Sequence, residues 1–192
     1  LVLAGARQTL SLAAFGMFAR LFVGLIIGLA AGWWQHSWLD RLVNVLVSIW
    51  AAFPATIFAM MLILGIGIEK GMSVFIITFC LIGWGELAQF VRSQVIQQKP
   101  RLYIEAARAT GAGQSTIIWR HIMPHLMPAL IVMSALEMGA VLMLLAELGF
   151  LNIFLGGGYK TEIGEVGKMI SVIYYFSDIP EWGALLSNIR DW

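Results

Sequence analysis

The chain has 192 residues, of which 60% are hydrophobic and only 12% are charged, and its mean hydropathy is +0.85. Soluble domains average about 45–50% apolar and about 25% charged residues, so a soluble globule of this composition would have more apolar surface than it could bury. The net charge of +1 does not indicate a nucleic-acid partner. The composition therefore predicts a membrane protein.

Residues 9–32 are the first predicted membrane-spanning helix, because about 20 mostly apolar residues are needed to cross the bilayer. Small residues recur along it at spacings of four or eight, which would let another helix approach closely in lipid. The alternative is the general enrichment of glycine in membrane helices. The small residues are Gly16, Gly24, Gly28 and Gly32.

Three more spans are predicted. The uncharged run over residues 42–68 is the clearest, and Pro54 predicts a kink within it, which membrane helices tolerate when neighbouring groups satisfy the freed carbonyl. Residues 72–91 and 126–149 predict the third and fourth spans. Cys80 is the only cysteine, so it can form no internal disulfide, and we expect it to pack against lipid or core.

The charges of two polar segments predict the orientation, because cytoplasmic loops are enriched in Lys and Arg. Residues 92–125 hold five basic residues and one glutamate, which predicts a cytoplasmic loop. Residues 150–192 hold more acidic than basic residues, which predicts an external loop, with a short helix around 165–176. An aromatic cluster would then lie at the cytoplasmic interface. Its members are Trp33, Trp34 and Trp38.

The cytoplasmic loop itself predicts two short helices joined by a glycine turn. The first follows Pro100 and stops at Gly111. The second begins with Ser115 as its N-cap and ends at Pro124. Such a rigid hairpin with small side chains suits insertion into a groove of another protein. On the residues alone, an amphipathic hairpin lying on the bilayer is an equal alternative.

Four ionisable residues lie inside the predicted spans, where such groups are costly and count as functional candidates. They are Arg20, Glu86, Glu137 and Glu147. They are candidates for the translocation pathway or for a helix interface. A salt bridge or an interface position near a helix end is favoured for Arg20 and Glu147. Glu137 lies deeper in its helix, and both interpretations stay open for it.

Catalytic and metal chemistry are not predicted. The spans hold no nucleophile with a base and no HExxH pattern, and a phosphate-binding GxxxxGK[ST] sequence is absent. His121 and His125 are four residues apart, but Pro124 lies between them and neither His36 nor another residue supplies an evident third ligand. We therefore expect no metal and no cofactor.

The spacing within the loop resembles a known motif. Glu105-Ala106-Ala107 is followed after three residues by Gly111, and after nine more by a tetrapeptide that ends in Pro124. This pattern resembles the EAA loop of the permease subunits of binding-protein-dependent ABC importers. Other stretches are similar to the oligopeptide, dipeptide and nickel branch of that superfamily. They are Tyr103-Ile104, Ile82-Gly83-Trp84, Val91-Arg92-Ser93-Gln94, Leu145-Ala146-Glu147 and Trp182-Gly183.

The resemblance implies an all-α, polytopic membrane helical bundle of the type I ABC importer permease kind. Residues 1–192 would be one transmembrane domain that lacks the first and last helices of a six-helix subunit, with residues 92–125 as the coupling loop. That loop would dock into a cleft of a separate ATPase subunit. The implied ATPase-coupling residues are Glu105, Ala106, Ala107, Gly111, His121 and Pro124.

The resemblance also implies partners. They are a second, related permease subunit, two cytoplasmic ATPase subunits and an external substrate-binding protein, with the chain as a multi-pass protein of the plasma (inner) membrane. The expected function is ATP-driven import of peptides or similar small solutes, with ATP hydrolysed by a partner. An ion-coupled secondary transporter is the alternative, since it would use an intramembrane carboxylate such as Glu137, but it would need no docking loop.

Overall fold

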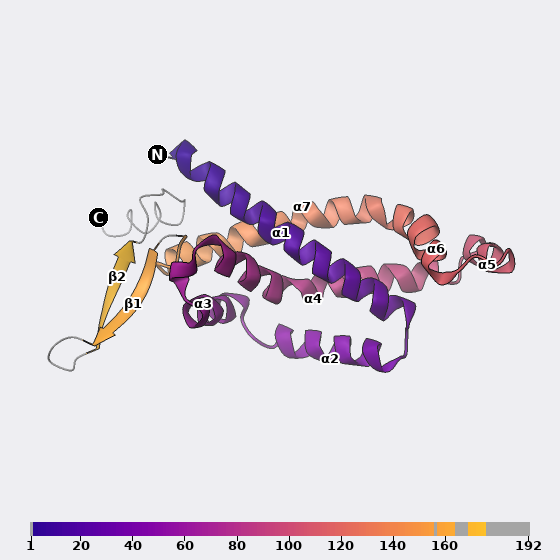
Figure 1. Ribbon diagram of the computed structural model, residues 1–192, viewed down its shortest axis with the longest axis horizontal. Helices are drawn as coiled ribbons and strands as arrows, with labels where there is room; N and C mark the ends of the chain where they lie inside the picture. Colours follow the sequence, from indigo (N-terminus) through magenta and orange to yellow (C-terminus); the bar gives the residue numbers. More distant parts are fainter. Residues whose placement is uncertain (1, 156, 164–168, 176–192) are drawn as a thin grey trace. The chain divides into compact units, whose positions relative to one another are not determined.

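The computed structural model describes residues 2–155, 157–163 and 169–175 (Figure 1). Most of this part of the chain is helical, as the sequence predicts. The α-helices are α1 (Val2–Trp33), α2 (Trp38–Ala51), α3 (Ala55–Ile66), α4 (Met72–Gln98), α5 (Leu102–Ala109), α6 (Gln114–Ile117) and α7 (Met123–Phe150). A short 3₁₀ turn at Ile68–Lys70 precedes α4, and a π-helical turn at Ile118–Ile122 precedes α7.

Three of the four predicted spans are confirmed as helices that are long and apolar enough to cross a membrane. They occupy Gly5–Trp33, Met72–Gln98 and Gln114–Phe150, the last of which combines α6, the π-helical turn and α7. Residues 92–98, which the sequence analysis assigned to the cytoplasmic loop, continue α4. The non-helical connection to α5 therefore begins at Lys99.

The prediction of one kinked helix over residues 42–68 is wrong, because the helix breaks at Pro54 into α2 and α3. Proline has no N–H to donate, and it disfavours helical geometry at the residue before it, Phe53. The two helices have 14 and 12 residues, and about 20 are needed to cross the bilayer. They make a fourth crossing if the pair is one broken span.

The prediction that a second short helix ends at Pro124 is also wrong. Helical geometry continues from Gln114 through the π-helical turn into α7, and Pro124 is the second residue of α7. Proline has no N–H to donate to the preceding turn, so the regular α-helical bonding pattern is interrupted here. A change of helical pitch at Ile118–Ile122, rather than a helix end, thus marks this point of the chain.

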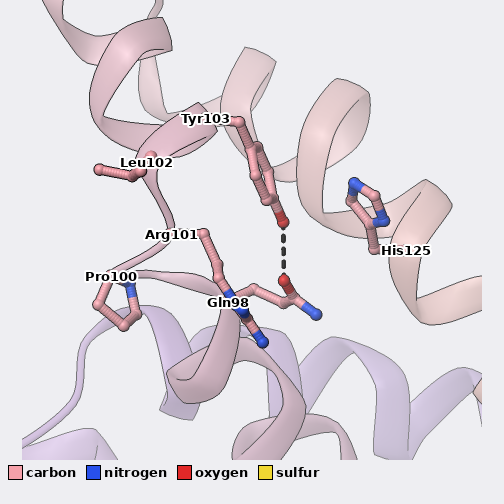
Figure 2. A pocket seen from close by; sticks show the side chains of 6 residues that line it. All are labelled: Gln98, Pro100, Arg101, Leu102, Tyr103 and His125. Carbon is pink, nitrogen blue, oxygen red and sulfur yellow. Dashed lines mark hydrogen bonds between the residues drawn. The ribbon is translucent and has the colours of Figure 1, made fainter.

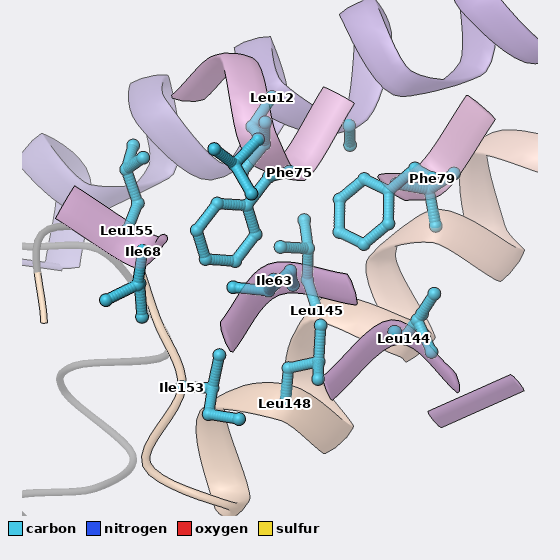
Figure 3. Packing of buried hydrophobic residues seen from close by; sticks show 14 residues of the cluster. Leu12, Ile63, Ile68, Phe75, Phe79, Leu144, Leu145, Leu148, Ile153 and Leu155 are labelled. Atoms are coloured by element: carbon cyan, nitrogen blue, oxygen red, sulfur yellow. The ribbon is translucent and has the colours of Figure 1, made fainter. Parts of the chain in front are cut away.

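The described chain divides into two compact units. The first contains residues 2–17, 54–82 and the described residues after 137, and an apolar cluster fills it (Figure 3). Phe75 and Phe79 of α4 meet edge to face with ring centroids 6.1 Å apart. Other members of the cluster come from α1, α3 and α7; they include Leu12, Ile63, Leu144, Leu145 and Leu148.

A β-hairpin follows the helices of this unit. β1 (Gly157–Ile163) pairs antiparallel with β2 (Met169–Tyr175), with Gly157 opposite Tyr175 and Ile163 opposite Met169. The predicted short helix is therefore wrong over residues 169–175, because the run MISVIYY is rich in β-branched and aromatic residues that favour strands. The rest of that prediction, and Trp182-Gly183, lie outside the described residues.

The second unit contains Phe18–Phe53 and Gly83–Glu137. Here α1 packs on α4 through the predicted glycine stripe: a Cβ at Gly24 would lie 2.5 Å from Cβ of Leu87, and a Cβ at Gly28 would lie 2.6 Å from the carbonyl oxygen of Ala88. Gly32 makes a similarly close contact with Val95. The predicted close packing of helix backbones is thus confirmed along this part of α1.

Candidate functional site

The helix α5 has one exposed and one buried face. Glu105 and Ala106 are exposed, whereas Ile104 and Ala107 are buried in an apolar cluster of the second unit. Of the predicted coupling residues, Glu105 and Ala106 therefore lie on the surface, and Ala107 packs against the unit's own core. The next turn of chain reverses at Gly111, whose φ of +81° is unfavourable for residues with a side chain.

Of the two remaining predicted coupling residues, His121 lies beside the ring of Tyr103, and His125, which is not one of them, lies beside the same ring. The Tyr103 ring centroid lies 6.4 Å from that of His121 and 5.1 Å from that of His125. Its hydroxyl donates a hydrogen bond of 2.8 Å to Oε1 of Gln98. Burial raises the pKa of the Tyr103 phenol above its ordinary value. His121 is half-buried and Pro124 is exposed.

An open pocket of about 790 Å³ lies beside Tyr103 (Figure 2). Leu102, the first residue of α5, is 81% exposed. Arg101 supplies a cationic group at the same place. The pocket is lined by Gln98, Pro100, Arg101, Leu102, Tyr103 and His125. This surface mixes apolar, aromatic and cationic groups, a combination that suits contact with another protein.

The intramembrane charges Arg20 and Glu137 form a buried ion pair. Nη1 of Arg20 lies 3.0 Å from Oε2 of Glu137, and each residue is 4% exposed. A Cβ at Gly83 would lie 2.2 Å from Nε of Arg20, so the absence of a side chain at Gly83 makes room for the guanidinium. The pair is one of the alternatives that the sequence left open, and it neutralises two charges inside candidate spans.

The other two intramembrane carboxylates lie in different surroundings. Glu86 is exposed on α4. Glu147 is half-buried in the first unit, where the Thr56 hydroxyl donates a hydrogen bond to its Oε2. Of the four predicted charges, Arg20 and Glu137 are thus the two that pair with each other.

A second ion pair, which the sequence analysis missed, joins α2 to α4. Nη2 of Arg92 lies 3.0 Å from Oδ2 of Asp40, a residue that is 3% exposed. The His36 backbone N–H donates to the same oxygen at 3.0 Å, and Nδ2 of Asn44 donates to Oδ1 at 3.0 Å. Local patterns give no signal for this pairing, because Arg92 is 52 residues away along the chain.

Trp33 was predicted only as part of an interfacial aromatic cluster, and the structure separates it from the others. Trp33 is 8% exposed, whereas Trp34 and Trp38 are 53% and 71% exposed. Its ring and backbone contact the segment that carries α5.

Among the residues that the structure describes, no group of three or more His, Cys, Asp or Glu side chains could hold a metal ion.

Similarity to known proteins covers almost the whole chain. Residues 24–187 match the family described as binding-protein-dependent transport system inner membrane component. The chain is 28% identical over 189 residues to the glutathione transport system permease protein GsiD of Pectobacterium atrosepticum, a match that covers 98% of this chain and 55% of that protein.

Two further relatives show similar coverage. The dipeptide transport system permease protein DppC of Alkalihalophilus pseudofirmus is 31% identical over 183 residues, which are 94% of this chain and 57% of that protein. The GsiD protein of Escherichia coli is 30% identical over 189 residues, which are 98% of this chain and 55% of that protein. The chain therefore spans about half the length of the curated relatives that it matches.

Proposed function

Because the chain belongs to the family of inner membrane components of binding-protein-dependent transport systems, we propose that it is a transmembrane subunit of an ATP-driven importer. Its helices form half of a translocation pathway, and α5 couples that pathway to a separate ATPase. The observation that carries the proposal is the two-faced helix α5, which lies between the candidate spans Met72–Gln98 and Gln114–Phe150.

The exposed side of α5 suits docking. Glu105 offers a carboxylate for polar contact with the ATPase, and Ala106 keeps the same surface thin enough for close approach. Gly111 permits the reversal of the chain directly after the helix. On the buried side, Ala107 and Ile104 hold the helix against the unit, so a push on the exposed face moves a packed body rather than a flexible loop.

His121 and Pro124 have supporting roles in this proposal. His121 lies beside Tyr103, and Pro124 lies in the first turn of α7 directly after the π-helical turn. They fix the direction in which the chain leaves the docking segment and enters the last described span. Neither residue is needed for direct contact with the ATPase.

The proposed cargo is a peptide or a similar small solute. The support is that the two kinds of relative are named for dipeptide and glutathione transport. The proposed partners are a second permease subunit, two cytoplasmic ATPase subunits and an external substrate-binding protein. ATP hydrolysis belongs to the ATPase subunits, and this chain supplies no catalytic group.

An ion-coupled secondary transporter is the second candidate, and one observation favours it. Glu86 is an exposed carboxylate within a candidate span, and such groups carry protons or ions in secondary transporters. Glu137, the carboxylate first considered for this role, is paired with Arg20. The two candidates differ in their energy source.

Reconstitution of the complete transporter in proteoliposomes tests the proposal. We expect uptake of a dipeptide or glutathione to require ATP and to stop when the ATPase subunits carry an inactivating substitution. We expect the Glu86→Gln variant to retain ATP-dependent uptake. Uptake driven by a proton gradient without ATP, and lost in Glu86→Gln, would establish the secondary transporter instead.

A further inference from the structure

Trp33 is the last residue of α1, and it lies where α1 meets the segment that carries the docking helix. A tryptophan at the end of a membrane helix commonly lies in the interface with its ring exposed to lipid headgroups. Trp34 and Trp38 fit that description, but Trp33 is buried within the second unit. Trp33 therefore does not expose its ring as an interfacial tryptophan does, and its contacts lie within the second unit.

Two cations flank the Trp33 ring. Nζ of Lys99 lies 5.6 Å from the ring centroid, and Cζ of Arg108 lies 5.7 Å from it. Both distances are within the range at which the π-face of an indole attracts a cation. Lys99 follows the end of α4, and Arg108 lies in the last turn of α5. The ring thus lies near the residue that follows α4 and near the C-terminal end of α5.

Two hydrogen bonds fix Trp33 to the same segment. Its indole Nε1–H donates to Oε1 of Gln114 at 3.0 Å, and its carbonyl oxygen accepts from Nζ of Lys99 at 2.8 Å. Gln114 is the first residue of α6. Trp33 therefore contacts the residue that follows α4, the end of α5 and the start of α6.

The apolar edge of Trp33 adds a third kind of contact. Trp33 belongs to the same buried cluster as Ile104 and Ala107, the inward-facing residues of α5. The exposed Glu105 and Ala106 lie on the other side of that helix. Burial, with a smaller effect of Arg108, lowers the pKa of the half-buried Lys99 ammonium group.

We propose that Trp33 is the positioning residue that transmits displacement of the docking helix α5 to the transmembrane helix α1. This inference rests on the proposed function, because it assigns to Trp33 the mechanical link behind the ATPase dock. One hydrogen bond, two cation–π contacts and apolar packing converge on the indole, so α5 and the end of α1 move together. Without the indole, the docking helix can move while α1 stays in place.

The test is the ratio of substrate molecules transported to ATP molecules hydrolysed by the complete reconstituted transporter. We expect Trp33→Leu to retain assembly with the ATPase subunits and to retain ATP hydrolysis, but to lower this ratio by about tenfold, within the usual range for coupling between sites. Trp33→Phe keeps an aromatic ring and loses the indole donor, so its ratio should lie between those of Trp33→Leu and the wild type. Trp34→Leu, a change at the exposed neighbour, is the matched control and should leave the ratio unchanged.

A wild-type ratio in Trp33→Leu would overturn the inference. If Trp33→Leu fails to assemble, Trp33→Phe and Gln114→Leu decide the matter, since each removes the 3.0 Å hydrogen bond and leaves most of the packing in place. A wild-type ratio in both variants would then contradict the proposed positioning role of Trp33. The wild-type transporter separates this failure from that of the proposed function: if its uptake needs no ATP, the proposed function is wrong, whatever the variants do.

Discussion

Each of the two compact units has its own kinds of internal contact, and these differ between the units. The first is filled by an apolar cluster around Phe75 and Phe79, and a hydrogen bond from Thr56 to Glu147 links α3 to α7 within it. The second unit also has an apolar cluster, but it adds the ion pairs of Arg20 with Glu137 and of Asp40 with Arg92.

This difference has a physical reason. In lipid, hydrophobicity does not drive helices together, so van der Waals packing and interhelical polar contacts decide how they associate. Polar contacts need defined partners, so they fix the register of helices more strictly than apolar side chains do. In the unit that carries the docking helix, two ion pairs specify the positions of the helices in this way.

Removal of one partner of the buried Arg20–Glu137 pair is expected to have the largest effect on stability. Arg20→Met leaves the carboxylate of Glu137 buried without its cation, which should lower the free energy of unfolding by about 3–5 kcal/mol. The measurement is unfolding of the detergent-purified chain in increasing dodecyl sulfate. The double variant Arg20→Met/Glu137→Met should recover most of the loss, because it leaves neither charge unpaired. Equal losses in the single and double variants would contradict this.

The second-largest loss of stability is expected from a change at the glycine contact between α1 and α4. A Cβ at Gly28 would lie 2.6 Å from a backbone oxygen, so Gly28→Ala should lower the free energy of unfolding by up to about 3 kcal/mol through overpacking. Gly65→Ala is the matched control in the first unit, where a Cβ meets nothing within 4 Å. We expect it to be neutral or slightly stabilising. If both variants lost similar stability in the same unfolding assay, close packing at Gly28 could not be the cause of its loss.

The smallest effects should come from single polar contacts, and they sharpen the comparison between the units. Asp40→Asn weakens the pairing with Arg92 while keeping the shape of the side chain, and it should cost about 2 kcal/mol. Thr56→Val removes the hydrogen bond to Glu147 in the first unit and should cost about 1 kcal/mol. Thermal unfolding in detergent would compare them, and a larger loss for Thr56→Val would reverse the proposed difference.

Local signals in the sequence were sufficient for the limits of α5. Pro100 and Gly111 predicted the limits of α5 because a proline favours a helix start and a glycine favours its end, and both effects act on adjacent residues. Pro54 predicted a kink, but whether a proline bends or breaks a helix depends on the neighbouring helices, which the sequence alone does not reveal.

Long-range contacts were beyond the reach of sequence patterns. Arg20 and Glu137 are 117 residues apart, and no periodicity links them. The burial of Trp33 depends on Lys99, Arg108 and Gln114, three polar residues that composition alone assigns to a solvated loop. The exposed residues of the proposed dock followed from a motif, whereas the residues that hold the dock in place required the structure.

The central claim is that the exposed face of α5 couples this chain to an ATPase, and a charge reversal tests it most directly. The measurement is ATP-dependent uptake by the complete transporter in proteoliposomes carrying Glu105→Lys. The matched control is Glu69→Lys, the same change at an exposed glutamate of the connection between α3 and α4, which the sequence predicts to lie on the external side. We expect Glu105→Lys to lower uptake by about tenfold, equivalent to about 1.4 kcal/mol of docking free energy, and Glu69→Lys to leave uptake unchanged. Wild-type uptake by Glu105→Lys, with the variant inserted and assembled normally, would contradict the claim.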